Sequence, residues 1–268
     1  MRDRYAVVGN PVAHSRSPQI HAECARATGQ DLEYGRIEAP LDGFERSVEE
    51  FRRQGGKGLN VTVPFKEAAF RYCRKASRRA QAAQVVNTLV LSASEVLGDT
   101  TDGIGLVTDL TRNIGFDLAG KKLLLMGAGG AAQGVVQALL DAGVSQLMVA
   151  NRTVSRARAL AARHGVEACG YEELHGRSFD VVVNATSTGL GSEAPRLPDS
   201  AFKPGALAYD MVYGRDTPFL VQARAAGARA FDGLGMLVEQ AAESFFVWRG
   251  VRPDTGALLA RLRSGQAL

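Results

Sequence analysis

Residues 59–66, LNVTVPFK, place polar side chains in a run that otherwise reads as a buried strand. Asn60 and Thr62 lie two residues apart, so both side chains project to one face of such a strand. Pro64 ends the strand, and Lys66 opens the next helix. A lysine held beside a substrate can give or take a proton. The alternative interpretation is that Lys66 is a solvated surface charge in the first turn of a helix.

Further polar residues stand where other expected strands end or helices begin. Ser17 precedes Pro18, which is the pattern of a helix N-cap, whereas Ser15 has no such structural reason to be there. Asn87 lies in an expected strand, and Asp102 stands at an expected helix start, where the helix dipole alone would also favour an acid. Together these groups suit a small polyhydroxylated substrate, because ligands of open α/β sheets lie at the carboxyl ends of strands.

A dinucleotide-binding signature follows another apolar strand. The strand at 123–126 runs into Gly127, Gly129 and Ala132, which form the pattern G-x-G-x-x-A, and a helical pattern follows over 131–142. Gly127 permits a tight turn, Gly129 lets the backbone approach a pyrophosphate, and Ala132 is small enough for close helix–strand packing. The helix N-terminus would hold the pyrophosphate. The expected cofactor contacts here are Gly127, Ala128, Gly129, Gly130 and Ala131.

The next strand, over residues 146–150, ends in Asn151 and Arg152. A site selective for NAD would place Asp or Glu here to accept a hydrogen bond from the ribose 2′-hydroxyl. A carboxylate would repel a 2′-phosphate, whereas an arginine can pair with it. The sequence therefore predicts NADP as the cofactor, bound by Asn151, Arg152, Thr153 and Arg156. A solvated arginine at a strand end is the alternative interpretation.

The composition is that of an ordinary globular chain. Of 268 residues, 46% are hydrophobic and 22% are charged, and the net charge is +4. The positive residues are scattered, which favours anionic small molecules over nucleic acid as partners. Cys24, Cys73 and Cys169 lack metal-ligand spacing, so we expect free thiols in a reducing compartment and no metal. No run reaches the ~18 apolar residues of a membrane span and no signal peptide stands out, so we expect a cytoplasmic protein, a monomer or homodimer, with no membrane partner.

Strand-like and helix-like segments alternate along the chain, which predicts α/β architecture with parallel sheets covered on both faces. The expected strands are 5–9, 33–39, 58–63, 86–91 paired hairpin-like with 96–97, 123–126, 146–150, 179–184 and 206–211. The expected helices are 18–28, 43–53, 66–74, 78–83, 131–142, 155–164, 218–226, 236–248 and 255–263. Turn residues near 98–105 mark a boundary. We expect two domains: an N-terminal α/β domain of 1–101 with 237–268, and a Rossmann-type doubly wound parallel sheet in 102–236.

Short motifs run in order along the whole chain: Gly9-Asn10-Pro11, His14 to Pro18, Asn60 to Pro64 with Lys66, Val86-Asn87-Thr88, Thr101-Asp102-Gly103, Gly127 to Ala132, Asn151-Arg152-Thr153, Asn184 to Ser187, Asp210-Met211 with Tyr213, and Gly233 to Met236 with Gln240. In this order they resemble the shikimate dehydrogenase family over essentially the full length. The resemblance implies an NADP-dependent oxidoreductase that reversibly reduces 3-dehydroshikimate to shikimate in the chorismate pathway of aromatic amino acid biosynthesis. It also implies that the first domain binds shikimate and the second binds NADP.

The resemblance further implies roles for single residues. The substrate contacts would be Ser15, Ser17, Asn60, Thr62, Asn87, Tyr213 and Gln240. Lys66 and Asp102 would be the catalytic pair, in which the lysine gives a proton to the developing alkoxide and the aspartate holds both the lysine and a substrate hydroxyl. Thr186, Met211 and Gly233 would lie along the nicotinamide side of the cofactor.

The chain departs from the family pattern at three places. Thr100 stands where the family commonly has Asn, and Arg78 stands where an acid is often found. The turn between Tyr213 and Thr217 is about one residue short. The first two departures concern residues around the catalytic pair, and the third concerns the placement of Tyr213.

Three other functions are compatible with parts of this pattern. A quinate/shikimate dehydrogenase that uses NAD is disfavoured by Arg152. The paired Ser15 and Ser17 do not suit a folate-linked dehydrogenase with a similar two-domain outline. A sensor that binds NADPH without catalysis is disfavoured because Lys66 and Asp102 are both retained.

Overall fold

The computed structural model describes residues 2–186 and 196–264. The chain forms two compact units, one of residues 1–105 with 237–268 and one of residues 106–236. The division near residue 105 falls inside helix α5 (Asp102–Thr108), a few residues beyond the boundary expected at 101/102. Both units are α/β, as the alternating pattern predicts.

The first unit is built on a six-stranded sheet. Its strands are, in spatial order, β2 (Leu32–Glu38), β1 (Asp3–Gly9), β3 (Gly56–Val61), β5 (Thr88–Leu91), β6 (Val96–Asp99) and β4 (Lys75–Ala76). β3, β5 and β6 pair antiparallel, whereas β2, β1 and β3 pair parallel. The hairpin-like pair expected from the sequence is therefore present as β5 and β6. Because its connection is too short for a parallel crossover, this sheet is mixed rather than wholly parallel.

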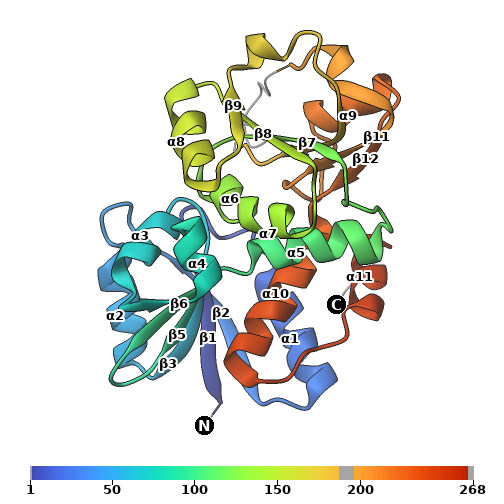
Figure 1. The fold of residues 1–268 in the computed structure, drawn as a ribbon. Coiled ribbons are helices and arrows are strands. Elements are labelled where there is room, and N and C mark those ends of the chain that lie inside the picture. The colour runs from blue at the N-terminus through green and yellow to red at the C-terminus, as the bar shows by residue number, and fades with distance from the viewer. Residues whose placement is uncertain (1, 187–195, 265–268) are drawn as a thin grey trace. The chain divides into compact units, whose positions relative to one another are not determined.

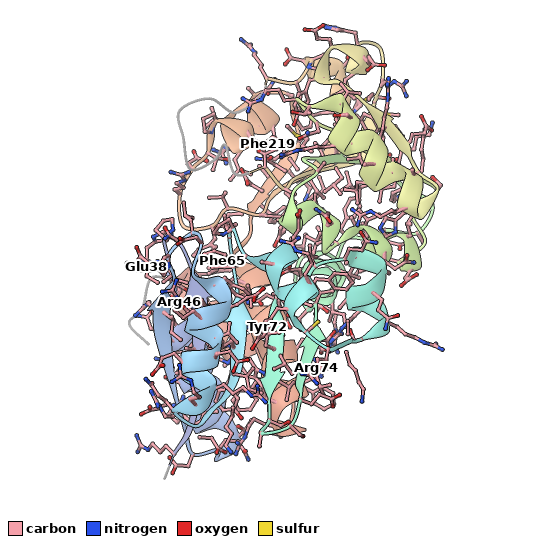
Figure 2. All side chains as sticks on the ribbon, turned by 90° about the vertical axis from the view of Figure 1, so that its left-hand side faces the viewer. Glu38, Arg46, Phe65, Tyr72, Arg74 and Phe219 are labelled. Atoms are coloured by element: carbon pink, nitrogen blue, oxygen red, sulfur yellow. The ribbon has the colours of Figure 1, made fainter. Side chains whose placement is uncertain are left out.

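Helices cover both faces of this sheet (Figure 1). They are α1 (Ser17–Thr28), α2 (Phe44–Arg53), α3 (Lys66–Tyr72), α4 (Arg78–Ala83), α10 (Leu234–Arg249) and α11 (Gly256–Arg263). α2, α3 and α4 pack on one face, where Val48, Phe65 and Ala69 join the core around Leu59 and Val61. Figure 2 labels Phe65 and, at the end of α3, Tyr72 on this face. α1 lies on the opposite face with the part of α10 that belongs to this unit.

The second unit is a doubly wound parallel sheet. Its order is β12 (Arg229–Asp232), β11 (Phe202–Asp210), β10 (Phe179–Asn184), β7 (Lys122–Met126), β8 (Gln146–Ala150) and β9 (Glu167–Cys169), and every pair is parallel. Numbered within the unit and read from β9, this order is 3-2-1-4-5-6, the Rossmann order, so the predicted fold is confirmed. The order reverses between β7 and β10, and a ligand of such a sheet is expected at that reversal.

The helices of the second unit form two layers over this sheet. They are η1 (Asp109–Asn113), which continues α5, then α6 (Gly130–Gln133), α7 (Val136–Asp141), α8 (Val154–His164), η2 (Tyr171–Leu174), η4 (Asp199–Ala201) and α9 (Pro218–Ala225). α6, α7 and α8 pack with η1 into one buried cluster, and η2, η4 and α9 pack into the other. The helix expected over 131–142 is thus two segments. Within residues 2–186 and 196–264, no helix has the length and apolar character needed to cross a membrane.

Candidate active site

Lys66 and Asp102 form a close ion pair in the first unit. Lys66 is the first residue of α3 and Asp102 the first of α5, so each side chain projects from the start of a helix. Nζ of Lys66 lies 2.5 Å from Oδ2 of Asp102, and the two side chains are only 13% and 5% exposed. A lysine so enclosed is not the solvated surface charge that Lys66 alone suggests. Its ammonium group is held at hydrogen-bond distance from a partner, and a residue that transfers a proton needs such positioning.

Asn87 ties Asp102 to the surrounding strands. Its Nδ2 donates to Oδ1 of Asp102 at 2.9 Å and approaches Oε1 of Gln240 at 3.3 Å. Its Oδ1 accepts from the backbone N–H of Thr101 at 2.9 Å and from the Thr88 hydroxyl at 2.8 Å. Both oxygens of the Asp102 carboxylate are therefore occupied by protein donors. The fixed carboxylate in turn fixes Lys66.

The Asn60 side chain is 6% exposed and is the centre of a buried polar cluster. Its Oδ1 accepts from the Tyr34 hydroxyl at 2.7 Å and lies 3.1 Å from Nε2 of His21. Its Nδ2 donates to the Ser244 hydroxyl at 2.9 Å and lies 3.2 Å from the Asn87 carbonyl. Because every hydrogen-bonding group of this amide has a protein partner, a substrate contact at Asn60 would have to share one of them. That contact stays a prediction.

Ser15 and Ser17 lie together at the start of α1. The Ser17 side chain does not cap α1, since Arg16 occupies the N-cap position and α1 has no side-chain cap. It is Ser15 that accepts the Ser17 backbone N–H, at 3.2 Å, so the structural roles expected for the two serines are reversed. Arg36 donates to the Ser15 carbonyl from Nη2 at 2.6 Å. Two hydroxyls beside a guanidinium suit an anionic group such as a carboxylate.

Thr62 follows β3 and is half-buried. Its methyl group lies against Gly9, where a Cβ would come within 2.3 Å of Thr62 Cγ2. Gly9 therefore leaves the room that this approach requires. Among the described residues no hydrogen bond joins Thr62 to Lys66. The substrate contact expected of Thr62 stays a prediction.

Two of the departures from the family pattern, Thr100 and Arg78, lie in the first unit, and Thr100 stands two residues before Asp102. Thr100 Oγ1 is buried without a hydrogen-bond partner among the described residues. The Thr100 backbone N–H donates to Asp99, which Arg79 holds through two hydrogen bonds of 2.7 and 2.6 Å. Arg78 is exposed at the first position of α4, and its neighbour Arg79 also pairs with Glu243 at 2.8 Å. The Asp99–Arg79–Glu243 network thus supports the loop before Asp102 without an acid at position 78.

The second unit carries the expected cofactor residues. Gly127 has φ 106°, a conformation that favours glycine, and a Cβ there would meet the Ala185 carbonyl at 3.1 Å. Gly129 precedes α6, and a Cβ on it would meet no atom within 4 Å. The turn therefore leaves its backbone open for close approach by a phosphate. Ala128 lies in this turn, and Gly130 and Ala131 are the first two residues of α6.

Asn151, Arg152 and Thr153 follow the end of β8, and Arg156 lies in the first turn of α8. Nδ2 of Asn151 donates to the Thr153 carbonyl at 2.9 Å, which closes the turn, while Arg152 and Arg156 are exposed. The two arginines sit at the strand end where a 2′-phosphate would lie, and no carboxylate occupies residues 151–153. This residue set fits NADP better than NAD.

The ends of β10 and β11 are joined by a buried carboxylate. Asp210 accepts from Thr217 Oγ1 at 2.6 Å and from Asn184 Nδ2 at 3.2 Å. Asn184 in turn accepts from the Thr186 hydroxyl at 2.7 Å. Burial raises the pKa of Asp210, and these hydrogen bonds oppose that effect. The network fixes Thr186. The hydrogen bond from Thr217 to Asp210 also closes the turn between these two residues, although that turn is about one residue short.

The remaining expected residues of the second unit lie near this network. Gly233 lies so close to Met211 that a Cβ on it would be 2.4 Å from the Met211 carbonyl oxygen. Tyr213 is half-buried in the turn after β11, and it belongs to a different unit from the other expected substrate contacts. Ser187 lies outside the described residues. The roles of Thr186, Met211, Tyr213 and Gly233 stay predictions.

Sequence reasoning missed His21, Tyr34 and Ser244 around Asn60. Each is separated from Asn60 by at least 26 residues, so only the paired strands and α10 reveal the contact. A signal was present for Ser244, because it stands one helical turn after Gln240 and shares its face of α10. His21 and Tyr34 gave no comparable signal.

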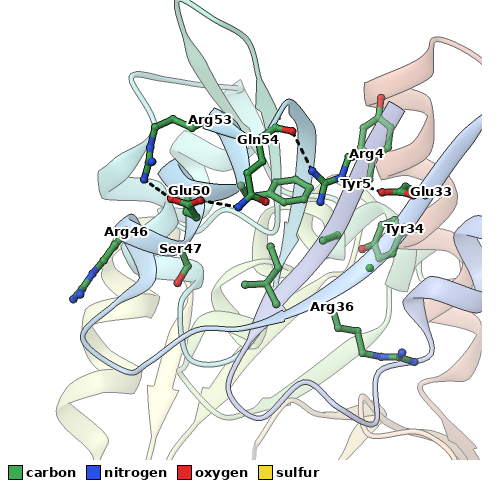
Figure 3. A pocket seen from close by; sticks show the side chains of 14 residues that line it. Arg4, Tyr5, Glu33, Tyr34, Arg36, Arg46, Ser47, Glu50, Arg53 and Gln54 are labelled. Atoms are coloured by element: carbon green, nitrogen blue, oxygen red, sulfur yellow. Dashed lines mark hydrogen bonds and ion pairs between the residues drawn. The ribbon is translucent and has the colours of Figure 1, made fainter. Parts of the chain in front are cut away.

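The pocket in Figure 3 lies elsewhere on the first unit, over β1, β2 and α2. It has a volume of about 770 Å³, and none of the expected substrate contacts lines it. Its wall contains the ion pairs Arg4–Glu33, at 3.0 Å, and Arg53–Glu50, at 2.5 Å. Two of its arginines are thus paired with neighbouring carboxylates, and neither Lys66 nor Asp102 lines the pocket.

His21 makes the stability of the protein sensitive to acid. The imidazole is fully buried, and burial lowers its pKa from 6.5 to about 3 despite its hydrogen bond to Asn60. Below pH 6.5 the unfolded chain binds a proton that the folded chain excludes until about pH 3, so the free energy of unfolding falls as the pH falls through that window. Chemical denaturation should show a wild-type decline steeper than that of His21→Gln by on the order of 1 kcal/mol per pH unit. The exposed His175→Gln is the control, and parallel curves for wild type and His21→Gln would contradict the assignment.

Comparison with known proteins agrees with this geometry. The shikimate dehydrogenase substrate binding domain family matches residues 7–89, the shikimate/quinate 5-dehydrogenase family matches 109–203, and the shikimate 5′-dehydrogenase C-terminal domain family matches 233–263. A shikimate dehydrogenase (NADP(+)) of Aromatoleum aromaticum is 56% identical over 97% of this chain and 97% of its own. One from Methylobacillus flagellatus is 53% identical over 98% and 99%.

Solved structures extend the match to the fold. An Ael1 enzyme from Pseudomonas putida has a TM-score of 0.89 and 48% identity, covering 97% of this chain and 98% of its own. Shikimate 5-dehydrogenase from Thermus thermophilus, solved in complex with NADP(H) and shikimate, has a TM-score of 0.88 and 37% identity, covering 98% and 99%. The order of motifs, the Rossmann unit and the near-complete coverage all agree. The chain belongs to the shikimate dehydrogenase family.

Proposed function

We propose that this protein is an NADP-dependent shikimate dehydrogenase that interconverts 3-dehydroshikimate and shikimate in aromatic amino acid biosynthesis. The observation that carries the proposal is the enclosed Lys66–Asp102 pair at 2.5 Å, at the heads of two helices. The full-length relatives named shikimate dehydrogenase (NADP(+)) support the same reaction. The first unit would bind the substrate and the second NADP.

Lys66 moves the proton in this proposal. When bound, NADPH supplies the hydride that reduces the C3 carbonyl. Lys66 gives its proton to the oxygen as negative charge develops there, and takes it back from the hydroxyl in the reverse direction. Asp102 orients the ammonium group, and Asn87 holds the carboxylate from its other oxygen at 2.9 Å. The lysine is thus fixed before the substrate arrives.

Hydroxyl and amide groups of the first unit would orient the substrate. Asn60, Thr62, Asn87 and Gln240 would contact its hydroxyl groups. Ser15 and Ser17 would donate to its carboxylate. The Arg36 guanidinium donates to the Ser15 carbonyl, and its positive charge would favour a carboxylate bound there. Tyr213 is proposed as a further substrate contact.

The second unit would hold the cofactor through its strand ends. The turn from Gly127 to Gly129 and the start of α6, at Gly130 and Ala131, would cradle the pyrophosphate. Asn151, Arg152, Thr153 and Arg156 would bind the 2′-phosphate side, and Thr186, Met211 and Gly233 the nicotinamide side. Support comes from the open backbone at Gly129 and the exposed Arg152.

The cellular setting is a further part of the proposal. We expect the enzyme in the cytoplasm, because Cys24, Cys73 and Cys169 are free thiols that a reducing compartment preserves. We expect a monomer or homodimer acting on small molecules. Cell fractionation and light scattering of the purified protein would test these two points.

The purified protein with shikimate and NADP⁺ should produce the absorbance band of reduced nicotinamide, and 3-dehydroshikimate with NADPH should consume it. NAD⁺ in place of NADP⁺ should give much slower turnover. Better turnover with NAD⁺ would refute the role proposed for Arg152. No turnover with either cofactor would refute the proposed function.

A further inference from the structure

We propose that Tyr209 is a positioning residue of the cofactor site, whose hydroxyl group, held by the buried carboxylate of Asp109, fixes the first turn of α10 and thereby the nicotinamide contact at Gly233. Neither Tyr209 nor Asp109 belongs to the motifs that carry the family resemblance. All three residues lie in the second unit. The inference rests on the proposed function, because it takes Gly233 as a nicotinamide contact. It assigns Tyr209 no contact with the reacting atoms.

The Tyr209 hydroxyl group joins β11 to the start of α10. It donates to Oδ2 of Asp109 at 2.7 Å and accepts from the backbone N–H of Met236 at 3.2 Å. Met236 is the third residue of α10, so its N–H is one of the groups that find no acceptor within the helix. The phenol gives its one proton to the carboxylate and uses its oxygen for the N–H, so both hydrogen bonds can form together. Tyr209 thus acts as a cap of α10 that is supplied by another element.

The Asp109 carboxylate lies against the same turn of α10. A Cβ on Gly235 would come within 1.9 Å of Oδ1 of Asp109, an approach that leaves room for glycine alone. Oδ1 also accepts from Nδ2 of Asn113 at 3.0 Å. Negative charge is favoured at this place, because it faces the N-terminal end of a helix. Burial and the neighbouring carboxylate raise the pKa of Tyr209 well above its usual range, so the phenol keeps the proton that it donates.

The local structure around Asp109 favours a role in positioning. Asp109 opens η1, a π-helical turn in which the Ile114 N–H donates to the Asp109 carbonyl at 2.9 Å. Such turns are frequent at functional sites. Asp109 and Tyr209 are both 0% exposed, and a buried carboxylate is costly to desolvate. A satisfied buried polar network fixes one arrangement of the groups that it joins, which apolar packing alone does less well.

Gly233 depends on this turn for its position. It immediately precedes α10, and its N–H donates to the Val212 carbonyl at 3.1 Å. A Cβ on it would be 2.4 Å from the Met211 carbonyl oxygen, so the two backbones touch. A shift of the first turn of α10 would therefore move Gly233 relative to Met211, and these are the two residues proposed here for the nicotinamide side. Each glycine of the segment 233–235 thus has its own reason: Gly233 admits Met211, and Gly235 admits Asp109.

Tyr209→Phe removes only the hydroxyl group, and with it the link between Asp109 and Met236. We expect the dissociation constant for NADP⁺, measured by titration calorimetry, to rise about tenfold, the loss associated with one hydrogen bond in a positioned site. Adenosine 2′,5′-bisphosphate carries the adenine, the ribose and the 2′-phosphate but no nicotinamide. Its dissociation constant should stay within about twofold of wild type. A merely structural role of Tyr209 would weaken both ligands or neither.

Gly235→Ala tests the same contact from the other side, because its Cβ would displace the Asp109 carboxylate from Tyr209. It should show the same selective loss for NADP⁺. Tyr72→Phe is the control for the phenol, since Tyr72 also donates to a carboxylate, that of Glu49, but lies in the first unit. Gly256→Ala is the control for the glycine, at the first residue of α11, where a Cβ would meet the nearest atom at an ordinary 3.5 Å. Both controls should bind NADP⁺ as the wild type does.

Thermal melting establishes which variants are folded at the assay temperature. An unchanged dissociation constant for NADP⁺ in Tyr209→Phe, or an equal loss for NADP⁺ and the bisphosphate, would overturn the inference. If Tyr209→Phe does not fold, Gly235→Ala decides by the same two criteria. Absence of shikimate turnover in the wild type, with NADP⁺ bound and the selective loss observed, would instead overturn the proposed reaction alone.

Discussion

Lys66→Ala is expected to lower the turnover of shikimate at least about 100-fold, the usual scale of a lost acid–base group. The reason is that Nζ of Lys66 is the proton carrier of the proposal and lies 2.5 Å from Asp102, in a site that leaves it 13% exposed. Affinity for shikimate should change far less, because in the proposal hydroxyl and amide groups of other residues hold the substrate. Steady-state kinetics in both directions, with shikimate affinity from calorimetry, measure the two effects separately.

The matched control for this prediction is Lys75→Ala. Lys75 also forms a carboxylate ion pair, with Glu95 at 2.8 Å, but its side chain is 72% exposed and has no expected role in the site. It should retain wild-type turnover, because exposed pairs contribute little. Lys66→Met, which keeps most of the side-chain length without a proton to give, should be as inactive as Lys66→Ala. Near-normal turnover in either Lys66 variant would contradict the assignment of the catalytic pair.

Arg152→Asp is expected to lower kcat/KM for NADP⁺ at least about 100-fold, because it removes a charge-assisted hydrogen bond and places a carboxylate against the 2′-phosphate. The exposed Arg152 follows the end of β8, where an NAD-selective fold carries an acid. The same carboxylate can accept from the 2′-hydroxyl of NAD⁺, so kcat/KM for NAD⁺ should rise. Arg156 remains nearby and should limit the loss for NADP⁺.

The control for this change is Arg158→Asp, which reverses the same charge on an exposed residue of α8, two positions beyond Arg156. It should leave the ratio of NADP⁺ to NAD⁺ activity within about threefold of wild type, because exposed charges are largely screened beyond one Debye length. An unchanged ratio in Arg152→Asp would show that the phosphate is recognised elsewhere.

Much of the fold could be predicted because several strands have sequences that are recognisably those of buried strands. β7, β8 and β10 are continuous apolar runs, and Gly127 after β7 fixes the Rossmann turn. β4, β9 and β12 were missed, since they are two to four residues long and carry too few side chains for a period. The break between α6 and α7 was also missed, because the helical pattern continues across it.

The site was less predictable, because its residues meet only in the tertiary structure. Lys66 and Asp102 could be chosen as a pair by resemblance, but their 2.5 Å contact depends on the packing of α3 and α5. Tyr34 could not be chosen, since its partner Asn60 lies 26 residues away and reaches it only through the pairing of β2, β1 and β3. The N-cap expected of Ser17 was wrong because Ser15 takes the Ser17 N–H.

The most direct test of the proposed reaction is isotope transfer from reduced cofactor to substrate. NADPH carrying deuterium at the transferred position of its nicotinamide would be incubated with 3-dehydroshikimate and the purified protein. NMR of the product should show shikimate with one deuterium on C3, and Lys66→Ala should form it at least about 100-fold more slowly. Deuterium at no carbon of the product, or equal rates for wild type and Lys66→Ala, would contradict a hydride transfer assisted by Lys66.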